Sequence, residues 1–297
     1  MEAGFCGPGL MGAPMIRHLL RAGHTVHVWN RSPDKAHALV KDGARVAPTP
    51  GALAGCAELI FLCVSDASAV EQVVFDAEHG IVSAARRAAG TTRVRRIVDH
   101  SSIAPSATRS LAQRAAAAGI GWVDAPVSGG VAGATAGTLA VMAGGAVADV
   151  EAVRPVIGAY AARVTHMGDV GAGQTAKLCN QSIVTATVAA IAEAVSLAQR
   201  SGIDAARLSE ALSGGWADSV LLQTFVPRMT RSGDAPIGAL RTFQKDVDTI
   251  AATAYETGTP MPVAGTVQQL LRLAAAMGLA DADFSAFIDV LQPGQRR

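Results

Sequence analysis

A glycine-rich turn near the start of the chain most strongly limits the possible folds. Residues 3–7 form a short apolar segment, Gly7-Pro8-Gly9-Leu10-Met11-Gly12 follows, and residues 11–21 have a helical pattern. This order of strand, GxGxxG and helix is typical of a dinucleotide-binding unit, because the glycines let backbone N–H groups approach a pyrophosphate at the helix N-terminus. The alternative is a glycine turn used only for packing. The segment predicts a nucleotide site at Gly7, Gly9, Leu10, Met11 and Gly12.

Strand and helix patterns then alternate as far as residue 158. Apolar strand patterns cover residues 25–29, 59–64, 97–99 and 139–143, and helical patterns begin at Ser32-Pro33, Asp66 and Pro105. Such alternation predicts an α/β fold with a doubly wound, mostly parallel sheet that is covered on both faces. Ligands are then expected beyond the carboxyl ends of the strands.

Asn30 and Arg31 follow the second strand, about twenty residues after the glycines, where an NAD site usually has an acidic residue for the ribose. A guanidinium is suited to a 2′-phosphate because it donates paired, charge-assisted hydrogen bonds. The alternative is that Arg31 is a solvent-facing residue that does not select the phosphate. These two residues favour NADP, with NAD as the second choice.

Polar residues also follow the next two apolar strands. Ser65 comes after residues 59–64, and His100-Ser101-Ser102 comes after residues 97–99. The serines are placed to contact a cofactor, although a serine after a strand is as often a helix cap. His100 is either an acid or base at a cleft edge or, as we favour, an ordinary hydrogen-bonded histidine.

Small residues dominate residues 128–138, beginning with Ser128-Gly129-Gly130. We expect a loop here whose uncovered backbone donors suit a carboxylate. A flexible surface loop is the alternative, because the glycine content allows both.

The stretch from Gly168 to Gly202 predicts one long helix, and because its middle and end are apolar on all sides we expect it to be buried between two bodies. A membrane span is less favoured, because the strongly apolar run 183–198 falls short of about twenty residues and contains Glu193. Lys177 and Asn180 lie three residues apart and therefore share a helix face. Beyond this helix only helical patterns remain, which predicts a domain of residues 1–167 followed by an all-helical domain of residues 168–297.

Composition restricts the remaining choices. The net charge is +1 and half the residues are hydrophobic, so neither a disordered chain nor a nucleic-acid partner is indicated. The four cysteines show no metal-ligand spacing and suit a reduced compartment. With no signal-peptide pattern at the N-terminus, we expect a cytoplasmic protein without a metal ion.

Four motifs together resemble the β-hydroxyacid dehydrogenase family, which includes 3-hydroxyisobutyrate dehydrogenase and tartronate semialdehyde reductase. They cover nearly the whole chain in the family order: Phe5 to Met15 for the cofactor, Asp124 to Gly130 for the substrate, Gly171 to Asn180 for catalysis, and Lys245-Asp246. The chain departs from the commoner pattern at His100, where a small or apolar residue is more frequent, and at Pro8.

The resemblance implies an oxidoreductase that interconverts a small 3-hydroxy acid and its semialdehyde by hydride transfer with NADP. Lys177 would be the catalytic acid or base, and its pKa would then have to fall from about 10.4. Asn180 and the Ser128–Gly130 segment would hold the substrate. Ser102 and Lys245 would lie by the cofactor.

Other functions are compatible with parts of the sequence. An imine-reducing relative typically has another residue at the lysine position, and 6-phosphogluconate dehydrogenase-like chains are much longer. A protein that binds NADP without catalysis is an alternative from a different class. In the helical half, Trp216, Asp218, Ser219 and Phe225 are candidates for substrate contacts, and the apolar long helix favours a homodimer or homotetramer.

Overall fold

A computed structural model describes residues 1–88, 91–231 and 236–292 and shows two compact units, Met1–Lys177 and Leu178–Arg297. The chain passes between them within one helix, α9 (Ala172–Arg200). The expected domain boundary between residues 167 and 168 stays a prediction.

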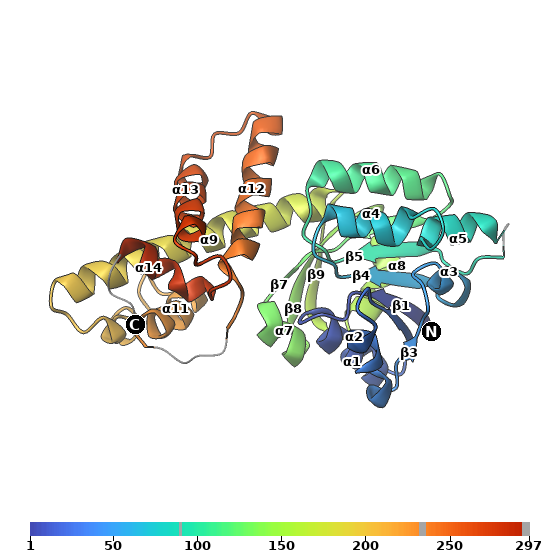
Figure 1. Ribbon diagram of the computed structural model, residues 1–297, viewed down its shortest axis with the longest axis horizontal. Coiled ribbons are helices and arrows are strands. Elements are labelled where there is room, and N and C mark those ends of the chain that lie inside the picture. Colours follow the sequence, from blue (N-terminus) through green and yellow to red (C-terminus); the bar gives the residue numbers. More distant parts are fainter. Residues whose placement is uncertain (89–90, 232–235, 293–297) are drawn as a thin grey trace. The chain divides into compact units, whose positions relative to one another are not determined.

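The first unit contains a mostly parallel sheet in the order β3-β2-β1-β4-β5-β6-β8-β7, with β9 paired to β8 (Figure 1). Only the pairs of β8 with β6 and β7 are antiparallel among the described strands. The strands are β1 (Glu2–Cys6), β2 (Thr25–Trp29), β3 (Arg45–Val46), β4 (Leu59–Leu62), β5 (Arg96–Asp99), β6 (Gly121–Asp124), β7 (Val127–Ser128), β8 (Leu139–Gly144) and β9 (Ala161–Gly168). The predicted doubly wound α/β class is confirmed, and the order reverses between β1 and β4, where such sheets bind ligands.

Helices cover both faces of this sheet (Figure 1). The helical elements are α1 (Gly12–Arg21), α2 (Pro33–His37), η1 (Val40–Asp42), α3 (Ala52–Cys56), α4 (Ala67–Phe75), α5 (Ile81–Arg87), α6 (Pro105–Ala116), α7 (Gly130–Ala136) and α8 (Val147–Ile157). Because side chains alternate along a strand, Phe5 and Phe61 pack with α1 and α8, whereas Cys6 and Leu62 belong to the core beneath α3 to α6.

The second unit is helical and has its own core. Its elements after α9 are η2 (Ala205–Arg207), α10 (Leu208–Ala211), α11 (Val220–Thr230), α12 (Leu240–Thr257), α13 (Pro262–Ala276), η3 (Phe284–Ala286) and α14 (Phe287–Leu291). Phe284 lies at the centre of this core, stacked on Phe243 and edge-on to Phe225 and Phe287. The expected helical second half is therefore present.

The long helix α9 is apolar enough, by length and composition, to cross a membrane, and half of its most apolar window is buried. Val188, Ala192 and Val195 lie in the core of the second unit, as expected of a core helix. Ile183 and Leu197 of the same helix are 67% and 68% exposed, so α9 also has apolar residues outside this core, and its expected burial between two bodies stays a prediction.

Candidate functional site

The glycine turn after β1 has the close backbone approaches that a pyrophosphate loop requires. A Cβ added at Gly7 would lie 2.2 Å from the backbone oxygen of Cys63, and one added at Gly12 would lie 2.2 Å from that of Gly7. Around Gly9, by contrast, a Cβ would meet no atom within 4 Å. Helix α1 begins here without a side-chain cap or an acidic residue in its first turn. The uncovered backbone therefore fits the phosphates of a dinucleotide.

Asn30 and Arg31 occupy the end of β2, beside this turn. The Asn30 amide donates to the Ser32 carbonyl at 2.9 Å, which fixes the corner of the chain. Arg31 is exposed and forms no ion pair with the described residues. Its guanidinium therefore remains available for an anion. The residues directly after β2 are Asn30 and Arg31, so the acidic residue that is usual in an NAD site does not stand there.

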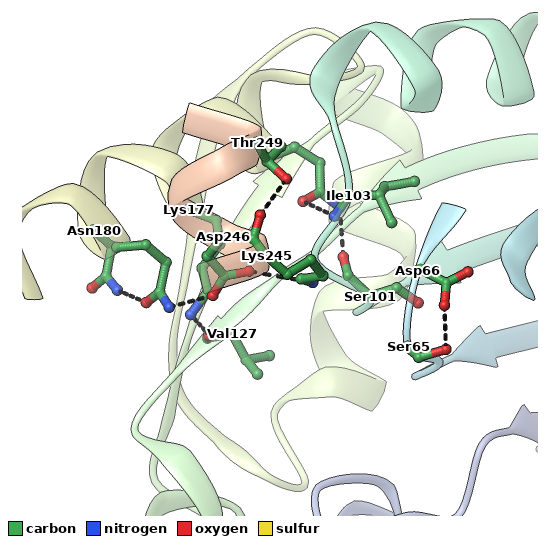
Figure 2. Close-up of polar contacts among 12 residues, drawn as sticks. Ser65, Asp66, Ser101, Ile103, Val127, Lys177, Asn180, Lys245, Asp246 and Thr249 are labelled. Atoms are coloured by element: carbon green, nitrogen blue, oxygen red, sulfur yellow. Dashed lines mark hydrogen bonds and ion pairs between the residues drawn. The ribbon is translucent and has the colours of Figure 1, made fainter. Parts of the chain in front are cut away.

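The serines after β4 and β5 have different environments. The Ser65 hydroxyl donates to Asp66 at 2.7 Å, and Asp66 caps α4 by accepting from the Ala69 N–H (Figure 2). Ser101 is buried and its hydroxyl accepts from the Val64 N–H at 3.1 Å, so it joins two strand ends. The buried hydroxyl of Ser101 therefore has a structural role. Ser102 is partly exposed, and its contact with the cofactor stays a prediction.

Lys177 lies in the second turn of α9, and its amino group donates to the Val127 carbonyl at 2.8 Å (Figure 2). The lysine side chain is therefore held beside β7, whose second residue is Ser128. Gly129 and Gly130 follow with φ angles of 121° and 60°, a conformation that favours glycine, and both are exposed. The structure thus brings Lys177 and the Ser128–Gly130 segment together.

The loop expected over residues 128–138 is wrong for residues 130–136, because these residues form α7. This helix ends at Gly137 in the left-handed region, and the ring of His18 in α1 hydrogen-bonds to the Thr135 carbonyl at 3.0 Å. Glycine and threonine have low helix propensity, so packing on α1 stabilises α7 against its local sequence preference.

Two residues without a predicted role fix the start of α9. Asp124 ends β6, and its carboxylate accepts from the N–H groups of Gly171 at 2.8 Å and Gln174 at 2.9 Å. Burial raises the pKa of Asp124, while these hydrogen bonds act in the opposite direction. Gln174 is also buried, and its side chain accepts from the Ile103 N–H and donates to the Ser101 carbonyl at 2.7 Å.

His100 is buried and uses both ring nitrogens. One contacts the Ala125 carbonyl at 2.6 Å and the other contacts the Tyr160 hydroxyl at 2.8 Å. Burial lowers the pKa of the imidazole to about 4, so the ring is neutral near pH 7. This is the ordinary hydrogen-bonded histidine that the sequence favours.

Asn180 and Lys245 lie in the second unit, where a buried glutamine connects them. Asn180 donates to Gln181 at 2.9 Å, Gln181 donates to Asp246 at 2.6 Å, and the Asp246 carboxylate lies 3.2 Å from the Lys245 amino group (Figure 2). No sequence signal distinguished Gln181. Its role depends on α9 meeting α12 some 65 residues later in the chain.

The four other candidates of the helical half have structural or solvent-facing positions. Asp218 accepts from Gly214 and Gln223, Ser219 caps α11, and Phe225 is buried in the core. Trp216 is fully exposed in the described chain. Apart from Trp216, these residues therefore have contacts within the second unit, and their role as substrate contacts stays a prediction.

Two family models match the chain. The NAD-binding domain of 6-phosphogluconate dehydrogenase matches residues 2–168, and the NAD-binding domain of NADP-dependent 3-hydroxyisobutyrate dehydrogenase matches residues 171–291.

The chain is also similar to characterised proteins over nearly its whole length. It is 37% identical to 2-hydroxy-3-oxopropionate reductase of Escherichia coli, with 98% of this chain and 97% of that protein covered. Identity to 3-hydroxyisobutyrate dehydrogenase of Pseudomonas aeruginosa is 34%, covering 95% and 94%. The solved structure of 3-hydroxyisobutyrate dehydrogenase from Mycobacterium tuberculosis with L-serine is 30% identical, covers 98% and 99%, and gives a TM-score of 0.84.

These matches agree with the glycine turn and with the division of the chain into two units. A nicotinamide cofactor is common to the matching families, and the loop geometry fits it. The chain therefore belongs to the β-hydroxyacid dehydrogenase family of NAD(P)-dependent oxidoreductases that act on CH–OH groups.

Proposed function

We propose that this protein interconverts a small 3-hydroxy acid and its semialdehyde, with NADP as cofactor and Lys177 as the acid or base. The observation that carries the proposal is the position of Lys177, whose amino group is held 2.8 Å from the Val127 carbonyl, next to the Ser128–Gly130 segment. L-Serine, present in the M. tuberculosis structure, is itself a small 3-hydroxy acid.

The cofactor, when bound, supplies or accepts the hydride. Gly7, Gly9, Leu10, Met11 and Gly12 would hold its pyrophosphate, because the turn has open space at Gly9 and leads directly into helix α1. In addition, Asn30 and Arg31 would hold the adenosine end. Ser65, Ser102 and Lys245 would contact other parts of the cofactor.

A different set of residues would hold the substrate. Ser128, Gly129 and Gly130 would bind its carboxylate through the exposed backbone of the two glycines and the hydroxyl of the partly exposed Ser128. Lys177 would remove the hydroxyl proton during oxidation and return it during reduction. Asn180, whose amide nitrogen donates to Gln181, would present its side-chain oxygen to the substrate hydroxyl.

The test is the oxidation of NADPH and NADH with succinic, tartronate and methylmalonate semialdehydes and glyoxylate. We expect wild-type turnover and a loss of about 10²- to 10⁴-fold in Lys177→Ala, the usual contribution of a general acid or base. Lys41→Ala is the matched control, because Lys41 is exposed in η1. A Lys177→Ala variant as active as wild type would refute the assignment. Tight NADPH binding by a wild type without turnover would favour a non-catalytic binding protein.

The NADP preference depends on Arg31, which is exposed and has no ion-pair partner among the described residues. Arg31→Ala should reduce kcat/KM with NADPH by about tenfold and leave kcat/KM with NADH within about twofold, because only NADPH carries the 2′-phosphate. Equal losses with both cofactors would show that Arg31 does not select the phosphate.

A homodimer or homotetramer also belongs to this proposal. Ile183 and Leu197 expose apolar side chains on α9, which association between copies would cover. Light scattering coupled to gel filtration measures the mass, and a monomer at micromolar concentration would contradict the proposal. A cytoplasmic location is supported by four free cysteines and is tested by cell fractionation.

A further inference from the structure

The hydrogen bonds of His100 determine which nitrogen carries its proton. The Ala125 carbonyl can only accept, so Nδ1, 2.6 Å away, must carry the hydrogen. Nε2 is then an acceptor, and the Tyr160 hydroxyl donates to it at 2.8 Å. Both side chains are buried, at 4% and 0% exposure, so water does not compete for these bonds. The Ala125 carbonyl thus fixes the tautomer, and the Tyr160 hydroxyl gives the second ring nitrogen a donor.

Aromatic packing holds the imidazole in place. The ring stacks on Phe61, with centroids 5.8 Å apart and planes 10° from parallel. Tyr160 lies edge-on to both rings, at 5.6 Å from His100 and 6.3 Å from Phe61. Because Phe61 in turn stacks on Phe5, the imidazole has little room to turn within the sheet core.

The segment that receives the imidazole bond also receives the Lys177 bond two residues later. The Ala125 carbonyl accepts from His100, the Pro126 carbonyl accepts from the Met142 N–H at 3.1 Å, and the Val127 carbonyl accepts from Lys177. Each carbonyl of the Ala125–Val127 segment therefore accepts a hydrogen bond from a different part of the first unit. His100 supplies the side-chain donor at the start of this segment.

We propose that His100 and Tyr160 are positioning residues for Lys177, acting through the Ala125–Val127 segment. The buried pair fixes the peptide carbonyl that receives the lysine amino group, and so fixes where that group meets the substrate. This inference rests on the proposed role of Lys177. Neither His100 nor Tyr160 touches the reacting atoms.

Two substitutions of similar shape separate positioning from packing. In His100→Asn the amide nitrogen can take the place of Nδ1 and donate to Ala125, whereas His100→Leu has the same branched shape without a donor. We expect His100→Leu to lower kcat about ten- to hundredfold, with the dissociation constant of NADPH within about twofold of wild type. His100→Asn should recover most of kcat. The kcat of Tyr160→Phe should fall between those of the two His100 variants, because this substitution removes only the hydroxyl that donates to Nε2.

A second readout does not require turnover. Competitive acetylation with acetic anhydride, followed by mass spectrometry, gives the rate at which Lys177 reacts as a function of pH, with exposed Lys41 as the internal reference. In His100→Leu the pH profile of Lys177 acetylation should differ from that of wild type, and in His100→Asn it should return.

Two outcomes would overturn the proposal: wild-type kcat and acetylation profile in His100→Leu, or equal impairment of the Leu and Asn variants in proportion to their lost thermal stability. If wild type reduces none of the aldehydes, the proposed function fails, and the acetylation profiles still decide whether His100 positions Lys177.

Discussion

The carboxyl group of Asp99 should make the stability of this protein fall as the pH rises towards neutrality. Asp99 ends β5 and is fully buried, with one oxygen accepting from the Ser101 N–H at 2.9 Å. The other oxygen, Oδ2, has no hydrogen-bond partner within the described residues. Burial raises the pKa of this carboxyl from its ordinary value of 3.8 to about 7; the hydrogen bonds from Ser101 oppose the shift, and the charge of Asp124 adds to it.

The sign and size of the change in unfolding free energy follow from the difference between the folded and unfolded pKa values of Asp99. Between pH 3.8 and about 7 the folded protein keeps a proton that the unfolded chain has lost. The stabilisation is therefore complete below pH 3.8 and is lost as the pH rises to about 7. A pKa difference of about 3 units corresponds to about 4 kcal/mol in the free energy of unfolding, at ~1.4 kcal/mol per unit.

Asp99→Asn isolates this contribution, because the amide oxygen can still accept from Ser101 but does not titrate. Urea unfolding followed by circular dichroism at pH 5, 6, 7 and 8 gives the free energy of unfolding of both proteins. We expect the wild-type value minus the variant value to fall by about 1.4 kcal/mol per pH unit up to pH 7, and then to level off. Asp34→Asn, at an exposed position in α2, is the matched control.

The subtraction is necessary because three buried or partly buried histidines have the opposite effect. Burial lowers the pKa values of His24, His27 and His100, so they make the wild-type protein more stable as the pH rises towards 6.5. A difference between wild type and Asp99→Asn that is constant, or that grows with pH, would refute the assignment of a protonated buried carboxyl.

Four other substitutions test the site directly. Gly12→Ala should lower the melting temperature, because its Cβ would lie 2.2 Å from the Gly7 backbone oxygen, whereas Gly9→Ala should leave the melting temperature unchanged and weaken NADPH binding in a fluorescence titration. Asp124→Asn should cost about 1–3 kcal/mol in urea unfolding, because one of the two N–H groups at the start of α9 loses its acceptor. Gln181→Leu should raise the KM for the aldehyde about two- to tenfold by removing both amide hydrogen bonds; an unchanged KM would contradict its role.

Local patterns were sufficient for the elements that carry the glycine turn and Lys177. The apolar run 25–29 became β2 with the same bounds, and the glycines at the start of the long stretch preceded α9 as expected. These elements are predictable because burial requires an apolar run of the right period and the turn requires glycine.

Elements stabilised by distant partners were missed. β9 has a mixed pattern with Arg163, Thr165 and His166, and it forms because β8 supplies parallel hydrogen bonds. Helix α11 contains Pro227, which weakens a helical prediction, yet Phe225 anchors this helix in the core.

The side-chain pairs of the site could not be predicted either, because their partners are also distant in the sequence. His100 and Tyr160 are 60 residues apart, and Asp124 and Gln174 are 50 residues apart. Each residue type is ordinary in its local sequence. Only the order of the strands brings these pairs together.

The single crossing of the chain at Lys177 has an evolutionary consequence. The Val127 carbonyl and the Asp124 cap that hold the lysine both belong to residues 1–177, so they do not depend on the amino acids that follow Leu178. Recombination or rapid divergence of residues 178–297 therefore leaves the hydrogen bonds that hold Lys177 and the start of α9 intact. The two halves of such a chain can change separately, since the chain crosses between them once.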